Sequence, residues 1–172
     1  SGWHQDMLGH AHTYKNRSAL FRPIDLPSKY EMEIELAGFS RPHFVLSLTR
    51  NETVAEKASS FRLETLGQEL VLHHGGRQEL VMMLHENTSE LSLRMTFDTD
   101  EGVLRFFHGN GKRIKEIEVV SLPAGPLGIY VRNAGESLTV RRCKVRSLLK
   151  SETQTQSKAS PLITSAESSS TM

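Results

Sequence analysis

Apolar side chains at every second position, interrupted by turn residues, are the feature that most constrains the fold of this chain. The alternation is clear in Leu127–Val131, pauses at the turn formers of Asn133–Gly135 and resumes in Leu138–Val140. Two such segments joined by a short loop predict a half-buried β-hairpin. An isolated two-stranded ribbon is only marginally stable in water, so this hairpin must belong to a larger sheet.

The apolar parity shifts by one position after Val140. The next apolar residues are Cys143 and Val145, which would face solvent if the strand continued without interruption. One extra residue at Arg141–Arg142 would return both side chains to the core. We therefore predict a β-bulge at these arginines and a packing role for the Cys143 thiol.

The same alternation recurs along most of the chain. It is cleanest in Tyr30–Leu36, where the apolar side chains face one way and three glutamates face the other. Further strand-like segments are 16–21, an edge strand that ends at Pro23, and 44–48, 61–65, 70–73, 80–84, 91–97, 103–107 and 112–120. About eleven short strands with turn residues between them predict an all-β fold, a two-sheet antiparallel β-sandwich. We expect the residues before this first strand to wrap over the sheet, with Trp3 closing one end of the core.

Length and composition fit one domain followed by a tail. Residues 1–150 carry the strand pattern and form the predicted sandwich domain. In residues 151–172, half of the side chains are serine or threonine and very few are large aliphatics. Such a segment cannot bury enough apolar surface to offset its chain entropy, so we predict a disordered tail or linker within a longer polypeptide.

Charge, hydropathy and cysteine content exclude several classes of protein. The 21 Lys and Arg residues nearly balance the 20 acidic ones, for a net charge of +1, which argues against nucleic acid as a partner. No apolar run approaches the roughly 18 to 20 residues of a membrane span, so we expect no membrane insertion. Cys143 is the only cysteine, which excludes an intrachain disulfide and a multi-cysteine zinc site.

Five strand-like segments follow one another in an order that is also found in proteins of known fold. They are 26–34 (LPSKYEMEI), 44–48 (FVLSL), 91–98 (LSLRMTFD), 103–107 (VLRFF) and the closing hairpin 128–140. This order resembles the jelly roll of the concanavalin A-like lectin and glucanase superfamily. Within it, the pattern is most similar to laminin-G-like and 3-keto-disaccharide-hydrolase-like modules of bacterial extracytoplasmic proteins. The resemblance covers about residues 16–147 and implies a jelly-roll sandwich with one concave face.

The resemblance implies a function as well as a fold. It points to a non-catalytic binding module of a larger extracytoplasmic protein that recognises carbohydrate or a protein partner. Two alternatives stay open: a glycoside-active enzyme whose carboxylates come from separate strands, and a structural domain that assembles with a copy of itself or with neighbouring domains. The glucanase members carry Glu-x-Asp-x-x-Glu, whose carboxylates act as nucleophile and acid. The nearest segment here, Glu31–Glu35, has glutamate at every second position and no aspartate, so we assign no catalytic residues.

Four outward-facing side chains are candidate ligand contacts. Tyr130 and Arg132 lie on the closing hairpin, where Gly128 leaves room above the sheet. An aromatic face beside a guanidinium can stack on and hydrogen-bond a sugar or a peptide edge. Arg94 and His73 are the other two candidates.

Two short segments have side chains of the kind that bind metal ions. His10 and His12 are two residues apart and would share one side of a strand, but no nearby cysteine or carboxylate pattern completes a site, which favours a structural or adventitious role. Asp98 and Asp100 lie in an oxygen-rich turn of the kind that calcium prefers, and laminin-G-like modules can hold calcium at the sandwich rim. Turn propensity alone also explains these aspartates. We expect no cofactor, with calcium at Asp98 and Asp100 as the alternative.

Overall fold

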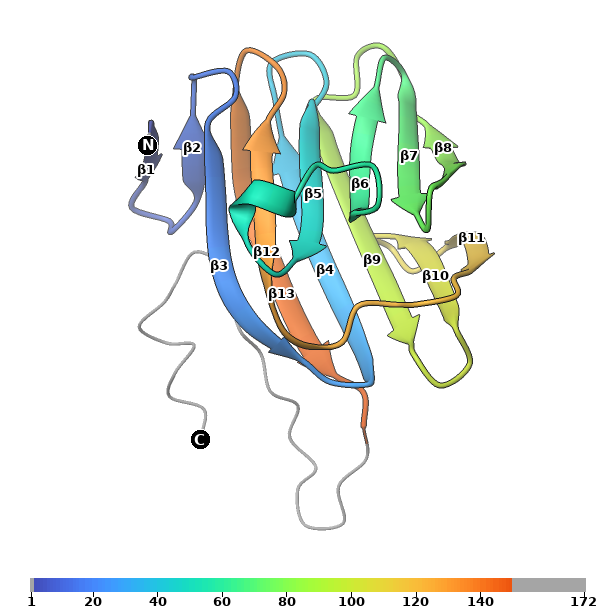
Figure 1. The fold of residues 1–172 in the computed structure, drawn as a ribbon. Coiled ribbons are helices and arrows are strands. Elements are labelled where there is room, and N and C mark those ends of the chain that lie inside the picture. The colour runs from blue at the N-terminus through green and yellow to red at the C-terminus, as the bar shows by residue number, and fades with distance from the viewer. Residues whose placement is uncertain (1, 150–172) are drawn as a thin grey trace.

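A computed structural model describes residues 2–149 and shows two β-sheets packed face to face (Figure 1). The seven-stranded sheet has the order β1-β2-β13-β4-β9-β10-β11, and the six-stranded sheet has the order β3-β12-β5-β6-β7-β8. All strand pairings are antiparallel. The predicted all-β sandwich is confirmed.

The strands are β1 (Trp3–Gln5), β2 (Ala11–Thr13), β3 (Ala19–Leu26), β4 (Lys29–Ala37), β5 (Phe44–Thr49), β6 (Phe61–Leu66), β7 (Glu69–His74), β8 (Arg77–Met83), β9 (Glu90–Asp98), β10 (Val103–His108), β11 (Arg113–Glu118), β12 (Gly125–Asn133) and β13 (Leu138–Ser147). A 3₁₀ turn, η1 (Glu52–Val54), lies between β5 and β6.

The core lies between the two sheets and uses the inward-facing half of each alternation. In β4, Tyr30, Met32 and Ile34 are fully buried, whereas the glutamates between them face outward. The Tyr30 ring stacks on Phe97 of β9, with the ring centroids 4.4 Å apart. Its hydroxyl donates a hydrogen bond of 2.8 Å to the carbonyl oxygen of Pro123, so the buried phenol keeps a polar partner.

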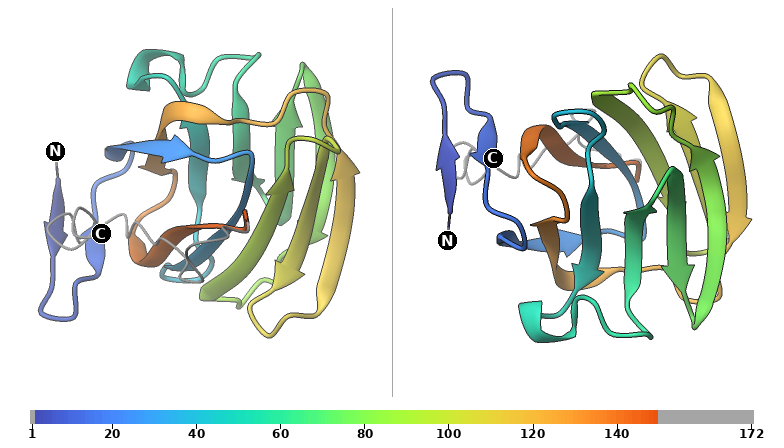
Figure 2. Two further views of the ribbon diagram at one scale, coloured as in Figure 1. Left: turned by 90° about the horizontal axis from the view of Figure 1, so that it is seen from below. Right: turned by 90° about the horizontal axis from the view of Figure 1, so that it is seen from above.

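The N-terminal segment differs from the prediction. It forms β1 and β2, a hairpin that extends the edge of the seven-stranded sheet and projects from the side of the sandwich, rather than wrapping over it (Figure 2). Strands of three residues are too short to show an alternation, which is why the sequence pattern missed them. Trp3 is partly buried against the core, as expected.

The first predicted strand is also placed differently. It runs from Ala19 to Leu26 and continues past Pro23 instead of ending there. Pro23 of β3 lies opposite Gly128 of β12. Strand β3 is at the edge of its sheet and has a partner on one side only. A proline on an edge strand does not interrupt a ladder, because its missing N–H can face away from the partner.

The predicted bulge is present in β13. The register between β13 and β4 shifts between Val140 and Arg142, which leaves Arg141 as the extra residue. Cys143 and Val145 are therefore returned to the core, where they are 2% and 5% exposed.

Burial raises the pKa of the Cys143 thiol to about 12. The thiolate is the reactive form, so the native protein should hardly react with Ellman's reagent at neutral pH. We expect one equivalent of thiol to react only after denaturant is added. Labelling of the native protein at the rate of a free thiol would contradict this placement of β13.

Some predictions concern parts of the chain that the structure does not describe. The predicted Ser/Thr-rich tail, residues 151–172, lies outside the described residues. Within residues 2–149, no helix has the length and apolar character needed to cross a membrane.

Candidate functional site

A row of paired residues crosses the outer face of the seven-stranded sheet near its β1–β2 edge. His4 of β1 pairs with His12 of β2, His12 pairs with Thr139 of β13, and Thr139 pairs with Ala37 of β4. The residues on either side of His12 and of Thr139 in the sequence are buried: Ala11, Thr13, Leu138 and Val140. Alternation therefore turns the four residues of the row away from the core.

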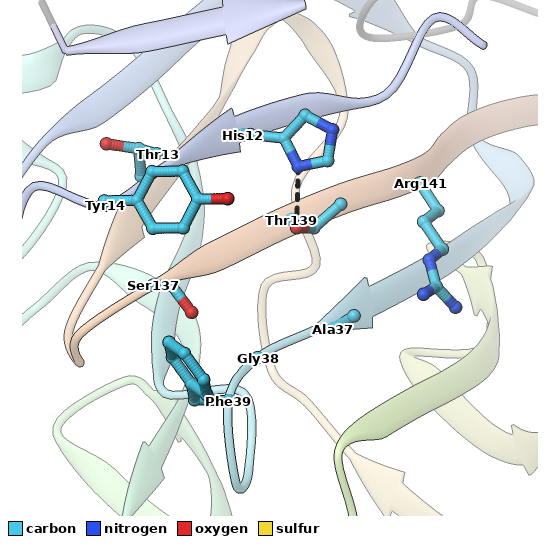
Figure 3. A pocket seen from close by; sticks show the side chains of 9 residues that line it. All are labelled: His12, Thr13, Tyr14, Ala37, Gly38, Phe39, Ser137, Thr139 and Arg141. Carbon is cyan, nitrogen blue, oxygen red and sulfur yellow. Dashed lines mark hydrogen bonds between the residues drawn. The ribbon is translucent and has the colours of Figure 1, made fainter. Parts of the chain in front are cut away.

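A pocket of about 260 Å³ opens above this row (Figure 3). We call it the rim pocket. Its lining comes from three segments that are far apart in the sequence but adjacent in the sheet: His12, Thr13, Tyr14, Ala37, Gly38, Phe39, Ser137, Thr139 and Arg141. The small Ala37 and Gly38 leave space, while Tyr14 and Phe39 remain 70% and 76% exposed.

The turn after β4 carries Phe39 to the rim pocket. A Cβ atom on Gly38 would lie 2.8 Å from the carbonyl oxygen of Arg41 and 3.0 Å from the Cα of Pro42. Glycine is therefore required for this close approach of the backbone to itself. The Gly38 N–H donates to the carbonyl oxygen of Ser89, 2.9 Å away, which ties the turn to the chain that leads into β9.

The β13 bulge contributes Arg141. Because Arg141 is the extra residue, its direction departs from the regular alternation, and Arg141 is one of the residues that line the rim pocket. The guanidinium of Arg141 forms an ion pair with Glu90 of β9. Between Arg141 and the aromatic side chains, the Thr139 hydroxyl is bonded to Nδ1 of His12, 2.9 Å away (Figure 3). The rim pocket thus combines exposed rings with hydroxyl and guanidinium groups.

Tyr130 and Arg132, two of the sequence-predicted contacts, face outward from the six-stranded sheet as expected, but both are bound to another part of the chain. The loop after β5 covers them, and Tyr130 is only 7% exposed. Its hydroxyl donates to Glu56 Oε2 at 2.7 Å, and Arg132 donates to both oxygens of the same carboxylate, at 2.6 and 2.8 Å. We call these three residues the Glu56 clasp.

The Glu56 clasp shifts the protonation of its members. Partial burial opposes the charge of Glu56, but hydrogen bonds from Arg132 and Tyr130 outweigh it and lower the pKa of the carboxyl. The hydrogen bond to Glu56 raises the pKa of Arg132, and burial raises the pKa of Tyr130. Glu56 is therefore ionised and both of its partners are protonated at neutral pH.

The other two predicted contacts lie on different sheets. His73 shares the outer face of the six-stranded sheet with the Glu56 clasp, and its Nε2 is 2.6 Å from Glu64 Oε1. Burial and the neighbouring Arg62 lower the pKa of His73. Arg94 lies on the outer face of the opposite sheet, 3.8 Å from carboxylate oxygens of Glu31 and Glu33. The four predicted contacts therefore do not form one site.

The predicted calcium ligands have local partners. The Oδ1 atom of Asp98 accepts backbone hydrogen bonds from Asp100 and Glu101, at 3.1 and 3.0 Å, and Oδ2 is 3.7 Å from Nζ of Lys29. These bonds are the turn-forming role that propensity predicts. Calcium binding at Asp98 and Asp100 stays a prediction.

Sequence patterns did not reveal the rim pocket. Its lining joins residues 12–14, 37–39 and 137–141, which only the pairing of β2 with β13 and of β13 with β4 brings together. One signal was present in the sequence. The parity break that predicted the β13 bulge marked Arg141, and bulges often redirect a side chain at a functional site.

Comparisons with solved structures identify the fold. No protein-family model and no curated protein match the chain. Solved structures do match: a sialidase (TM-score 0.58, 11% identity, 81% of this chain and 15% of the sialidase chain) and a putative glycosyl hydrolase from Parabacteroides distasonis (0.58, 12%, 85% and 90%). A galectin from Caenorhabditis elegans also matches, with a TM-score of 0.54, 12% identity and coverage of 78% of this chain and 94% of the galectin.

Identity at this level shows the fold alone, and the chain spans only a small part of the sialidase. The matched structures also include a carbohydrate recognition domain and a β-glucanase from Bacillus licheniformis. The two antiparallel sheets and the matches to solved structures together show that the chain has the concanavalin A-like jelly-roll fold.

Proposed function

We propose that this domain is a non-catalytic carbohydrate-binding module of a larger extracytoplasmic protein, and that it binds its ligand in the rim pocket. The observation that carries the proposal is the pair of exposed rings, Tyr14 and Phe39, beside a polar floor. Exposed aromatic side chains are costly in water and are common where a ligand covers them.

The chemistry of the rim pocket suits a sugar. A pyranose ring has apolar C–H faces that can lie against aromatic rings, and hydroxyl groups around its edge. Ser137 and Thr139 supply hydroxyl groups at the rim pocket. Arg141 pairs with Glu90 through Nη1, and its guanidinium has further N–H donors that can serve a ligand without displacing that bond. A concave site with a few placed polar groups among apolar ones is the usual composition of a small-ligand site.

The outer face of the six-stranded sheet is less suited to a ligand. Both oxygens of Glu56 are already bonded within the clasp, and the loop after β5 covers Tyr130. A sugar would have to displace these contacts before binding there, and displacing charge-assisted bonds is unfavourable.

Binding is favoured over glycoside hydrolysis at the rim pocket. Hydrolysis by the usual route needs two carboxyl groups on either side of the scissile bond. Among the described residues, the rim pocket lining includes neither aspartate nor glutamate. Release of reducing sugar by the purified domain would favour the enzymatic alternative instead.

The proposal predicts the effect of removing one ring. A glycan array should identify an oligosaccharide ligand, and Phe39→Ala should weaken its binding about tenfold or more, measured by calorimetry, because a central aromatic contact is lost. Val120→Ala is the matched control, since Val120 is a fully exposed apolar residue outside the rim pocket. Absence of binding to every glycan on the array, or equal affinity of Phe39→Ala and the wild type, would count against carbohydrate binding at this pocket.

A further inference from the structure

The β1–β2 hairpin brings together three side chains that can bind a metal ion. One carboxylate oxygen of Asp6 and one ring nitrogen each of His10 and His12 all lie within 4.8 Å of one another. The Oδ2 atom of Asp6 is 2.7 Å from Nε2 of His12 and 3.6 Å from Nδ1 of His10. The sequence pattern pointed to the two histidines alone, because Asp6 reaches them only through the hairpin turn that folds it back.

We propose that Asp6, His10 and His12 form a binding site for a divalent transition-metal ion of the zinc type. Two imidazoles and one carboxylate are a ligand set that zinc accepts, with a fourth position left for water or another ligand. Thiolate-free sites of imidazole and carboxylate also accept neighbouring transition ions such as cobalt. This site does not depend on the proposed carbohydrate function.

The hairpin holds the carboxylate in place through its other oxygen. The Oδ1 atom of Asp6 accepts hydrogen bonds from the backbone N–H groups of Leu8 and His10, both at 2.9 Å. The Asp6 N–H in turn donates to the carbonyl oxygen of His10 at 3.0 Å. One oxygen therefore fixes the loop, and the other is presented to the two imidazoles.

A second contact orients the His12 ring. Its Nδ1 is bonded to the Thr139 hydroxyl, 2.9 Å away, so Nε2 is the nitrogen left to face Asp6. Metal-binding histidines usually have such a partner on the other nitrogen, which fixes the ring and its tautomer. The His4 ring stacks beside His12, with centroids 5.8 Å apart, and supports the same orientation.

The distances require only a small adjustment. Zinc bonds of about 2.0 to 2.2 Å place tetrahedral ligand atoms roughly 3.3 to 3.6 Å apart. The Asp6–His12 pair at 2.7 Å must therefore open slightly, the Asp6–His10 pair at 3.6 Å already fits, and the two imidazoles, within 4.8 Å of each other, must close by about an ångström at most. The hairpin lies at the sheet edge and its turn, residues 6–9, is exposed except for Gly9, so the turn that carries Asp6 and His10 can make this adjustment without disturbing the core.

The test is a titration of the full chain with Zn²⁺ by calorimetry, and with Co²⁺ by visible absorption. We expect one equivalent to bind, with the intense d–d bands of a low-symmetry cobalt site. His12→Gln and Asp6→Asn should each weaken Zn²⁺ binding by more than tenfold, and Thr139→Val by about tenfold through loss of the ring orientation. Asp6→Asn keeps an oxygen that can accept the two loop hydrogen bonds.

Controls separate a built site from chance binding by histidine. His85→Ala removes an exposed imidazole elsewhere and should leave the affinity unchanged. His10→Gln changes only the hairpin turn, so it tests the site even if a His12 variant folds poorly. It should also leave oligosaccharide binding intact, because His10 does not line the rim pocket. Absence of Zn²⁺ binding, binding that survives His10→Gln, or an equal loss in His85→Ala would overturn the proposal.

Discussion

Replacing Phe97 with alanine is expected to lower the free energy of unfolding by about 3–5 kcal/mol, the usual cost of deleting a buried phenyl ring. Phe97 is 1% exposed, stacks on Tyr30 and also contacts Phe61 of the opposite sheet, with ring centroids 5.9 Å apart. It therefore joins the two layers. Urea denaturation followed by tryptophan fluorescence or circular dichroism measures the change, which is a large share of the stability of an ordinary domain.

The matched control is Thr96→Ala, one position earlier on β9. Thr96 faces the outside of the seven-stranded sheet, opposite Glu31 of β4. We expect this substitution to change the free energy of unfolding by about 0.5 kcal/mol or less. Similar losses for the two variants would mean that β9 does not present alternate faces to the core and to solvent.

Breaking the Glu56 clasp should have the second-largest effect. Glu56→Gln removes the charge that accepts three hydrogen bonds from Tyr130 and Arg132. Hydrogen bonds to charged groups contribute about 1.5–3 kcal/mol when buried, and the partial exposure of this site reduces the expected loss to about 1–2 kcal/mol. Urea denaturation at neutral pH measures it.

The effect should depend on pH in a defined direction. The pKa of Glu56 is lower in the folded protein than the ordinary value of 4.5. The stabilisation is therefore complete above pH 4.5 and is lost as the pH falls through the folded pKa. The difference between the wild type and Glu56→Gln should shrink under acidic conditions. Glu101→Gln, at a 61% exposed side chain, is the control with little expected effect at any pH. A difference that stays constant down to low pH would contradict the clasp.

The alternation in the sequence was enough to predict the two-layer architecture and the β13 bulge. Both depend on which side chains avoid water, and this information is local to each strand. Tyr130 and Arg132 were also correctly placed on an outer face, because parity alone decides that. The loop that covers them was not predictable, since its position depends on contacts such as the bond from Ser47 to the carbonyl oxygen of Ala55.

The rim pocket and the hairpin cluster were missed for a different reason. Each is assembled from short segments that become neighbours through the order of the strands in the sheet. The periodicity of apolar residues within one segment does not reveal that order. The strands β1 and β2 are also too short for periodicity to detect. Asp6 shows this most clearly, because only the turn that it stabilises brings it to His12.

The most direct test of the proposed function is to map the bound oligosaccharide on the protein by two-dimensional NMR of the backbone amides. The ligand is the tightest binder found on the glycan array. We expect chemical shifts to change around Tyr14, Phe39 and Arg141, at the edge of the seven-stranded sheet, while the amide chemical shifts of Tyr130 and Arg132 stay unchanged. Shift changes centred on the Glu56 clasp, with the rim pocket unaffected, would contradict it.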